Sequence, residues 1–279
     1  MHNYHVELFP ILTTTLINKK LQIFQIDAFT NKVFHGNPAA ICILDEWLDE
    51  EIMQKIGAEN NLAETAFVVN KDNNFEIRWF TPSVEVDLCG HATLAAAYVL
   101  YNYYNYPTRK IIFNSIKSGL LSVEKEKDSY TLDFPADTYE KAVPPQALID
   151  ALGITPLETY RGKTDYLLIF SSQKEIEDFK PDLNLIATVD CRGVIVSAPG
   201  NNVDFVSRFF APQSGIDEDP VTGSAHTTLI PLWANKLGKD ILSAKQLSKR
   251  QGDLTCELQG KRVKITGQAI TYLVGEIEI

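Results

Sequence analysis

Long apolar runs, clustered positive charge and closely spaced cysteines are all missing from this chain of 279 residues. Its longest uncharged stretches, such as 92–106, fall short of the ~20 apolar residues that span a bilayer, so we expect no transmembrane segment and no membrane partner. Lys and Arg are scattered through a chain of net charge −10, which argues against nucleic acid as a partner. The four cysteines are too far apart for a CxxC motif and indicate reduced thiols in a cytoplasmic protein.

The motifs of several large enzyme classes are also absent. The sequence has no GxSxG elbow, no P-loop and no strand-anchored GxGxxG, so hydrolase, phosphotransferase and dinucleotide-dependent activities find no support. His2, His5 and His35 lack the spacing of metal ligands, and no HxxxH pair occurs. We therefore expect no metal.

The length of the chain and its proline-containing segment predict two domains that follow a short N-terminal extension. Residues 1–20 place their lysines after the apolar part, the reverse of a signal peptide, and are expected to be an N-terminal extension. The proline-containing segment 135–145 is the best candidate linker. Because terminal strands often return to the first domain, we assign 21–134 plus 268–279 to an N-terminal domain and 135–267 to a C-terminal domain.

Alternating and apolar patterns predict an α+β protein. The expected helices cover about 45–58, 90–105, 146–152 and 223–236. The expected strands cover 21–29, 39–44, 66–69, 75–80, 111–114, 119–134, 165–170, 193–198, 204–210, 256–258, 262–266 and 269–278.

Two segments about 130 residues apart repeat one pattern. RWFTP at 78–82 precedes a helix that opens with Gly90 and His91, and RFFAP at 208–212 precedes a helix that opens with Gly223 and Ser224. A helix start leaves about four backbone N–H groups unpaired and carries a partial positive charge, so it binds carboxylates readily. Two such starts facing each other across a cleft predict an enzyme or a binder for a small anionic molecule.

Glu64 is the first candidate for the chemistry. It lies where a polar loop runs into an apolar strand, and partial burial there would raise its pKa toward neutrality, as a carboxylate that takes and returns a proton requires. A solvated loop carboxylate is the simpler interpretation of the residue taken alone.

Other candidates surround the two helix starts. His91 should be neutral at the positive helix end, whereas His226 is assigned to packing. Asp219 precedes Pro220 and either caps the second helix or meets a ligand amine or hydroxyl. Cys89 lies just before a helix start, where the pKa of a thiol is lowered. A two-thiol racemase mechanism is disfavoured, because the second copy carries 219–221 at that place, without a cysteine.

Taken together, these segments resemble the PhzF-like family, named for the phenazine-biosynthesis isomerase. The matches run in family order and the resemblance covers about 21–279. One departure is Ala92, where the phenazine enzyme has proline. The matching segments are Phe24–Thr30, Gly36–Ala40, Asn61–Thr65, Arg78–Pro82, Cys89–Thr93 and Asp219–His226.

The resemblance implies a diaminopimelate epimerase-like fold, in which two pseudo-symmetric domains each wrap a curved, mostly antiparallel, barrel-like sheet around a central helix and the active site lies in the cleft between them. It also implies cofactor-free isomerisation of a small anionic substrate by a homodimer. By this resemblance Glu64 transfers the proton, while His91, Asp219 and Ser224 hold or orient the substrate. The expected substrate-binding set is completed by Gly90, Gly223, Asn37 and Cys89.

Two alternatives stay open at this point. One is an epimerase or racemase of an amino-acid-like substrate, with Glu64 or Cys89 acting on one face and Asp219 on the other. The second is a ligand-binding or interaction protein without catalysis on an old enzyme scaffold.

Overall fold

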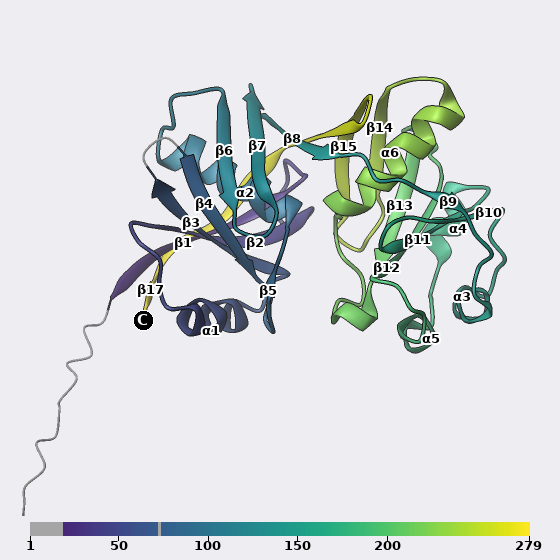
Figure 1. Cartoon of the computed structure of the whole chain (residues 1–279), viewed down its shortest axis with the longest axis horizontal. Helices are drawn as coiled ribbons and strands as arrows, with labels where there is room; N and C mark the ends of the chain where they lie inside the picture. The colour runs from purple at the N-terminus through teal and green to yellow at the C-terminus, as the bar shows by residue number, and fades with distance from the viewer. Residues whose placement is uncertain (1–18, 72–73) are drawn as a thin grey trace, which may run out of the picture.

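A computed structural model describes residues 19–71 and 74–279 as two lobes side by side (Figure 1). Most of the extension expected over 1–20 lies outside the described residues. The fold is mixed α/β and mostly strand. None of the helices in the described ranges is long and apolar enough to cross a membrane.

The first lobe is built from eight strands and two helices, and the C-terminal strand adds to it. These elements are β1 (Lys20–Ala28), β2 (Asn37–Leu44), α1 (Glu50–Asn60), β3 (Glu64–Lys71), β4 (Asn74–Phe80), β5 (Glu85–Val86), α2 (Gly90–Tyr103), β6 (Lys110–Ser115), β7 (Gly119–Glu126) and β8 (Ser129–Pro135). The sheet order around β1 follows from β17–β1 and β1–β2 antiparallel pairs and a β2–β3 parallel pair.

The second lobe holds the remaining elements. They are β9 (Glu140–Lys141), α3 (Gln146–Leu152), β10 (Glu158–Arg161), β11 (Asp165–Ile169), α4 (Gln173–Asp178), α5 (Leu183–Ala187), β12 (Gly193–Pro199), β13 (Phe205–Phe210), the 3-10 helix η1 (Pro212–Ser214), α6 (Gly223–Leu237), β14 (Ile241–Gln246), β15 (Gly252–Gln259) and β16 (Arg262–Gly267). The C-terminal strand β17 (Ala269–Glu278) belongs to the first lobe, where it pairs with β1.

Each lobe has one helix enclosed by strands. Ten of the 14 residues of α2 are buried, because the helix is apolar on nearly all sides and packs against β1, β2, β3 and β8. The corresponding helix α6 packs against β11, β14, β15 and β16. A surface helix would need a polar face, so these two sequences are suited only to the interior of a lobe.

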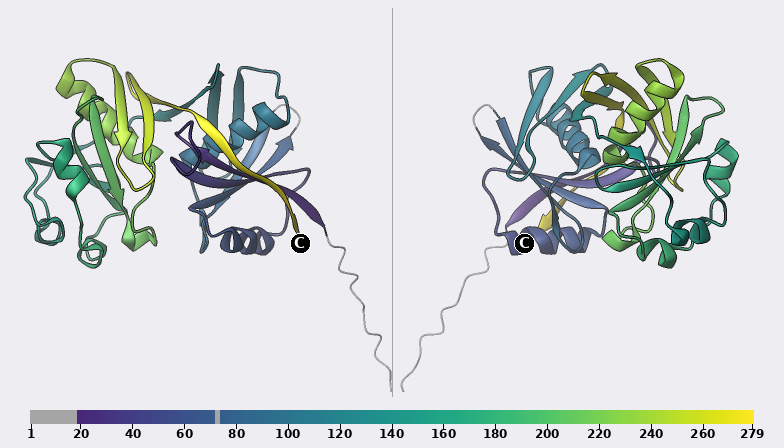
Figure 2. Two further views of the ribbon diagram at one scale, coloured as in Figure 1. Left: turned by 180° about the vertical axis from the view of Figure 1, so that it is seen from behind. Right: turned by 45° about the vertical axis from the view of Figure 1, so that its right-hand side comes forward.

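Strands that cross between the lobes hold them together. β16 pairs antiparallel with β8, and the chain then continues into β17, which runs back along β1 as the yellow strand of Figure 2 shows. The two helix starts, of α2 and α6, are therefore fixed relative to one another by continuous sheet.

Most expected elements are present, with some differences. β15 begins at Gly252 rather than at 256, and β2 begins at Asn37 rather than at 39. No sequence pattern predicted β5, β9, β10, β14, α4, α5 or η1. The segment 135–145 is not free of structure, because β9 lies in it and pairs with β10.

Candidate active site

The starts of α2 and α6 meet. A Cβ atom built on Gly90 would lie 3.8 Å from the Cα of Gly223, at ordinary contact distance. The residues that precede the two helices, Cys89 and Thr222, make no side-chain capping hydrogen bond, and neither helix has an acidic residue in its first turn. Two positive helix ends therefore converge without a side-chain cap, a favourable arrangement for an anion.

This geometry corrects the correspondence expected from the sequence. Because Gly223 opens α6 as Gly90 opens α2, the residue equivalent to Cys89 is Thr222, and Asp219 lies three residues earlier. The conclusion that the second copy has no thiol is unchanged.

Glu64 is the first residue of β3, opposite Ala39 of the parallel strand β2. Its side chain is buried, so water does not stabilise the charged carboxylate. Burial, reinforced by the negative charge of Asp219, raises the pKa of Glu64 to about 8. The solvated interpretation of Glu64 is thereby wrong.

The His91 ring lies between Glu64 on one side and Asn37 and Cys89 on the other. Its Nδ1 is 3.2 Å from Asn37 Nδ2 and 3.4 Å from Cys89 Sγ, while its Nε2 is 3.2 Å from Glu64 Oε2. The Asn37 amide nitrogen cannot accept a hydrogen bond, so an Nδ1–H group facing it would be poorly placed, and we assign the ring proton to Nε2. Burial lowers the pKa of His91 to about 3, so the ring is neutral, as expected.

Asn37 ties this group to Asp219. Its Nδ2 donates to Asp219 Oδ1 (2.7 Å) and to the Val221 carbonyl (3.0 Å). The second oxygen, Asp219 Oδ2, accepts from Thr222 Oγ1 at 2.6 Å. Burial raises the pKa of Asp219 to about 6, although the hydrogen bonds from Thr222 and Asn37 oppose the rise.

Gln246 supports this network, although it was not among the residues expected from the sequence. It lies on β14 and is fully buried. Its Nε2 donates to the Asp219 carbonyl at 2.7 Å, and its Oε1 accepts from the backbone N–H of Thr222 at 2.8 Å. The turn that carries Asp219 into α6 is therefore held from a strand that follows the helix.

The Cys89 thiol does not have the lowered pKa that was expected from its position before a helix start. Burial, with the charge of Glu64, raises the pKa of this thiol well above its usual value, so the expected lowering at a helix start is wrong. An uncompensated negative neighbour and loss of hydration outweigh the helix dipole here.

Buried polar atoms without partners converge at this place. Within 19–71 and 74–279, no hydrogen bond is formed by Asn37 Oδ1, Glu64 Oε2 or His91 Nε2; the last two are close but misaligned. Such groups are costly to bury unless a ligand or water meets them. The Asn37 amide oxygen, the Glu64 carboxyl and the His91 Nε2–H group are thus available to a substrate.

Glu64, Cys89 and His91 also come within the spacing of a metal site, with ligand atoms inside 4.8 Å of one another. A metal here would have to displace the protons that we assign to the buried Cys89 thiol and to His91 Nε2. The same chemistry suits proton transfer.

Of the other residues considered in the sequence, Ser224 lies in the first turn of α6 and His226 packs in the interior. Ser224, second in α6, accepts a hydrogen bond from Arg192 Nη1 at 2.9 Å. His226 is buried beside Phe205 and donates from Nδ1 to the Thr222 carbonyl at 2.8 Å, as a packing residue would. Arg192 was not among the candidates.

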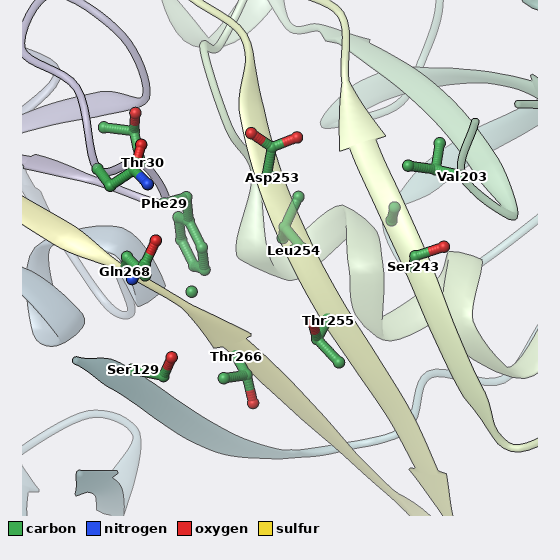
Figure 3. Close-up of a pocket in the computed structure, with 13 residues that line it drawn as sticks. Phe29, Thr30, Ser129, Val203, Ser243, Asp253, Leu254, Thr255, Thr266 and Gln268 are labelled. Atoms are coloured by element: carbon green, nitrogen blue, oxygen red, sulfur yellow. The ribbon is translucent and has the colours of Figure 1, made fainter. Parts of the chain in front are cut away.

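A separate pocket of about 330 Å³ lies where the end of β1 meets β15 and β16 (Figure 3). Phe29, Thr30, Asp253 and Thr266 are among its lining residues. None of the site residues expected from the sequence lines it.

Comparison with known proteins gives a consistent relationship. The profile of the phenazine biosynthesis-like protein family (PhzC-PhzF) matches residues 26–275. An uncharacterized isomerase of Pseudomonas aeruginosa is 49% identical over 260 residues, which cover 93% of this chain and all of the relative. A phenazine biosynthesis-like domain-containing protein of Bos taurus is 41% identical and covers 92% of this chain and 99% of its own.

Solved structures agree with the sequence comparisons. The crystal structure of a PhzF family protein from Enterococcus faecalis aligns with a TM-score of 0.91 and 44% identity, covering 94% of this chain and all of the other. A hydroxyproline epimerase from Agrobacterium vitis shares the fold alone, with a TM-score of 0.62, 9% identity and 93% of each chain covered. The chain belongs to the phenazine biosynthesis-like (PhzC-PhzF) family.

Proposed function

We propose that this chain is a cofactor-independent isomerase that moves a proton between two carbons of a small carboxylate-bearing substrate, amino-acid-like or cyclic, with Glu64 as the only acid and base. The relatives named isomerases support the reaction class. The proposal includes the two-domain, diaminopimelate epimerase-like arrangement, with boundaries at 134/135 and 267/268, and a cytoplasmic homodimer.

One observation carries the proposal. Glu64 is a buried carboxyl with a pKa raised to about 8, and its Oε2 atom forms no hydrogen bond in the described part of the chain. A carboxyl of this pKa both removes and returns protons near neutral pH, because neither form is strongly favoured.

The reaction follows from the neighbours of Glu64. The ionised carboxylate takes a proton from an allylic carbon, and the electron pair of that C–H bond forms a new double bond to the adjacent carbon. The electron pair of the old double bond moves to the far carbon and forms a new C–H bond with the proton that the same carboxyl returns. The substrate carboxylate binds the backbone N–H groups of Gly90 and Gly223. His91 donates from Nε2 to the charge that develops, and Asp219 accepts from an amine or hydroxyl of the substrate.

An epimerase is the second candidate. With Asp219 on the opposite face of the substrate, Cys89 is the alternative to Glu64 on the first face, because its Sγ belongs to the same cluster, within 4.8 Å. Its raised pKa weakens this candidate, because a thiol that stays protonated does not act as a base. A binder without catalysis remains the third, and it gives no reason for a carboxyl tuned to a pKa of about 8.

A solvent-exchange experiment tests the proposal. Metabolites that raise the melting temperature are incubated with the protein in deuterated buffer, and deuterium in the recovered compound is measured by mass spectrometry. The wild-type protein should introduce deuterium at carbon, and Glu64→Gln should reduce the rate at least about a hundredfold while binding persists. Glu124→Gln, on β7, is the isosteric control and should behave as wild type. Unchanged exchange in Glu64→Gln rules the proposal out.

A further inference from the structure

Arg192 is fixed in place beside the start of α6 by a buried carboxylate. The parallel strands β11 and β12 place Asp165 opposite Gly193, and Arg192 immediately precedes it. Arg192 Nε donates to Asp165 Oδ1 at 2.9 Å and Nη2 donates to Oδ2. This two-point contact fixes the plane of the guanidinium as well as its position.

An aromatic ring supports the other side of the guanidinium. Arg192 Cζ lies 5.3 Å from the centre of the Phe209 ring. Gly193 makes room for that ring, since a Cβ atom there would lie only 2.3 Å from Phe209 Cζ. Cation–π contact and the Asp165 pair together leave the side chain little freedom to rotate.

The remaining arm of Arg192 points to Ser224. Nη1 donates to Ser224 Oγ at 2.9 Å, so this oxygen acts as an acceptor and its own hydrogen is left to donate. Among the described residues, that hydroxyl hydrogen has no acceptor. Ser224 is the second residue of α6, next to the Gly223 that contacts Gly90.

The charge of the Arg192–Asp165 pair is unevenly placed. The Asp165 side chain is only 4% exposed, while that of Arg192 is 39% exposed, so the cation is on the open side. The positive charge of Arg192 also acts within the site, since it opposes the rise that burial causes in the pKa of Asp219. A positive charge beside an uncapped helix start increases the attraction for an anion.

We propose that Arg192 is a positioning residue for the substrate carboxylate, which fixes Ser224 with its hydroxyl hydrogen toward that anion and sets a preference for charged over neutral ligands. This inference rests on the proposed function, since it needs an anion at the two helix starts. It assigns a charge-selective role to a residue outside the Glu64 cluster.

The test compares two flat probes of nearly the same shape, anthranilate and anthranilamide, by calorimetric titration; the second carries a neutral amide in place of the carboxylate. The wild-type protein should bind anthranilate at least about tenfold more tightly, as expected for charge-assisted hydrogen bonds. Arg192→Gln should lose most of this preference, and Arg192→Lys, which keeps the charge but loses the fork, should keep part of it. Arg262→Gln removes a more exposed Arg–Asp pair and should leave the preference unchanged.

Folding is controlled separately, because Arg192→Gln leaves Asp165 buried without its cation. The double variant Asp165→Asn with Arg192→Gln removes both charges and should show the same loss of preference with a cooperative melting transition. An unchanged preference in the folded variants overturns the inference and leaves the proposed function intact. A wild-type protein that binds neither probe, or binds both equally, removes the carboxylate site and the inference with it.

Discussion

Burial shifts the pKa values of Glu64 and His91 in opposite directions and leaves both groups neutral near pH 7. Burial raises the pKa of the carboxyl to about 8 and lowers that of the imidazole to about 3, so both are neutral at pH 7 although their atoms lie 3.2 Å apart. Two neutral partners avoid the large cost of burying an ion pair. Glu64 can therefore ionise when substrate arrives without first breaking a salt bridge.

The titration of Glu64 predicts a pH-dependent stability. A carboxyl with a folded pKa above its unfolded value contributes stability that is complete below about pH 4.5 and is lost as the pH rises through about 8. Relative to Glu64→Gln, the wild-type protein should lose several kcal/mol of unfolding free energy over this window, at about 1.36 kcal/mol per pKa unit. Urea denaturation at pH 5, 6.5 and 8 measures the difference, and parallel profiles would contradict it.

Cys89 separates the isomerase from the epimerase. If Glu64 alone transfers the proton, Cys89→Ala should reduce solvent exchange less than about tenfold, because packing and only weak thiol hydrogen bonds, to His91 and to Glu64 itself, are lost. A thiol that acts as the second acid would instead make exchange fall about a hundredfold or more. Deuterium incorporation into the same substrate, measured beside Glu64→Gln, distinguishes the two. Cys256→Ala, also buried, is the matched control for loss of packing.

At the scale of elements, the connection between β1 and β2 positions Asn37. Gly36 has a φ of +63°, and its N–H donates to the Gln251 carbonyl at 2.7 Å. A Cβ atom at this position would lie 2.1 Å from the Ala28 carbonyl oxygen. Only glycine fits here, so the sequence GNP at 36–38 places the first residue of β2 in the site.

Gly36→Ala should therefore destabilise the protein by about 3 kcal/mol or more, since overlap with backbone is added to the cost of the left-handed conformation. Gly119→Ala is the control, because Gly119 has a φ of +71° with no atom within 4 Å of its Cβ position, and it should cost only about 1 kcal/mol. Chemical denaturation of both variants gives the comparison. Equal losses would show that the conformation alone, and not the contact with Ala28, requires glycine.

Helices and strands with a strong hydrophobic pattern could be predicted from the sequence, and the elements that were missed lack such a pattern for a physical reason. α2 and α6 are apolar on nearly all sides and were expected close to their observed bounds, as was the place of Glu64 at the start of β3. In β14 apolar and polar residues both occupy buried positions, so no clean alternation marks it. Arg192 and Gln246 depend on which strands lie side by side, which a local pattern does not contain.

At the scale of the molecule, Arg250 joins two distant parts of the chain. It follows β14, yet its Nη2 donates to Asp27 Oδ1 of β1 at 2.7 Å and to the His35 carbonyl at 2.9 Å. Its Nε donates to the Gly36 carbonyl at 2.8 Å. Asp27 is almost fully buried, and burial raises its pKa despite the nearby cation. The contact holds one lobe against the loop that delivers Asn37.

Removing this cation should loosen the whole molecule. Arg250→Met leaves Asp27 buried without a charge partner and frees two carbonyls, so we expect a loss of about 3–5 kcal/mol in the free energy of unfolding. The double variant Asp27→Asn with Arg250→Met should recover part of this loss, because the amide carries no charge and its oxygen still accepts from the Phe34 N–H. Urea denaturation of the full chain measures both. A single variant within about 0.5 kcal/mol of wild type would mean that the other links between the lobes, such as the β16–β8 pairing and the Asn37–Asp219 hydrogen bond, suffice without Arg250.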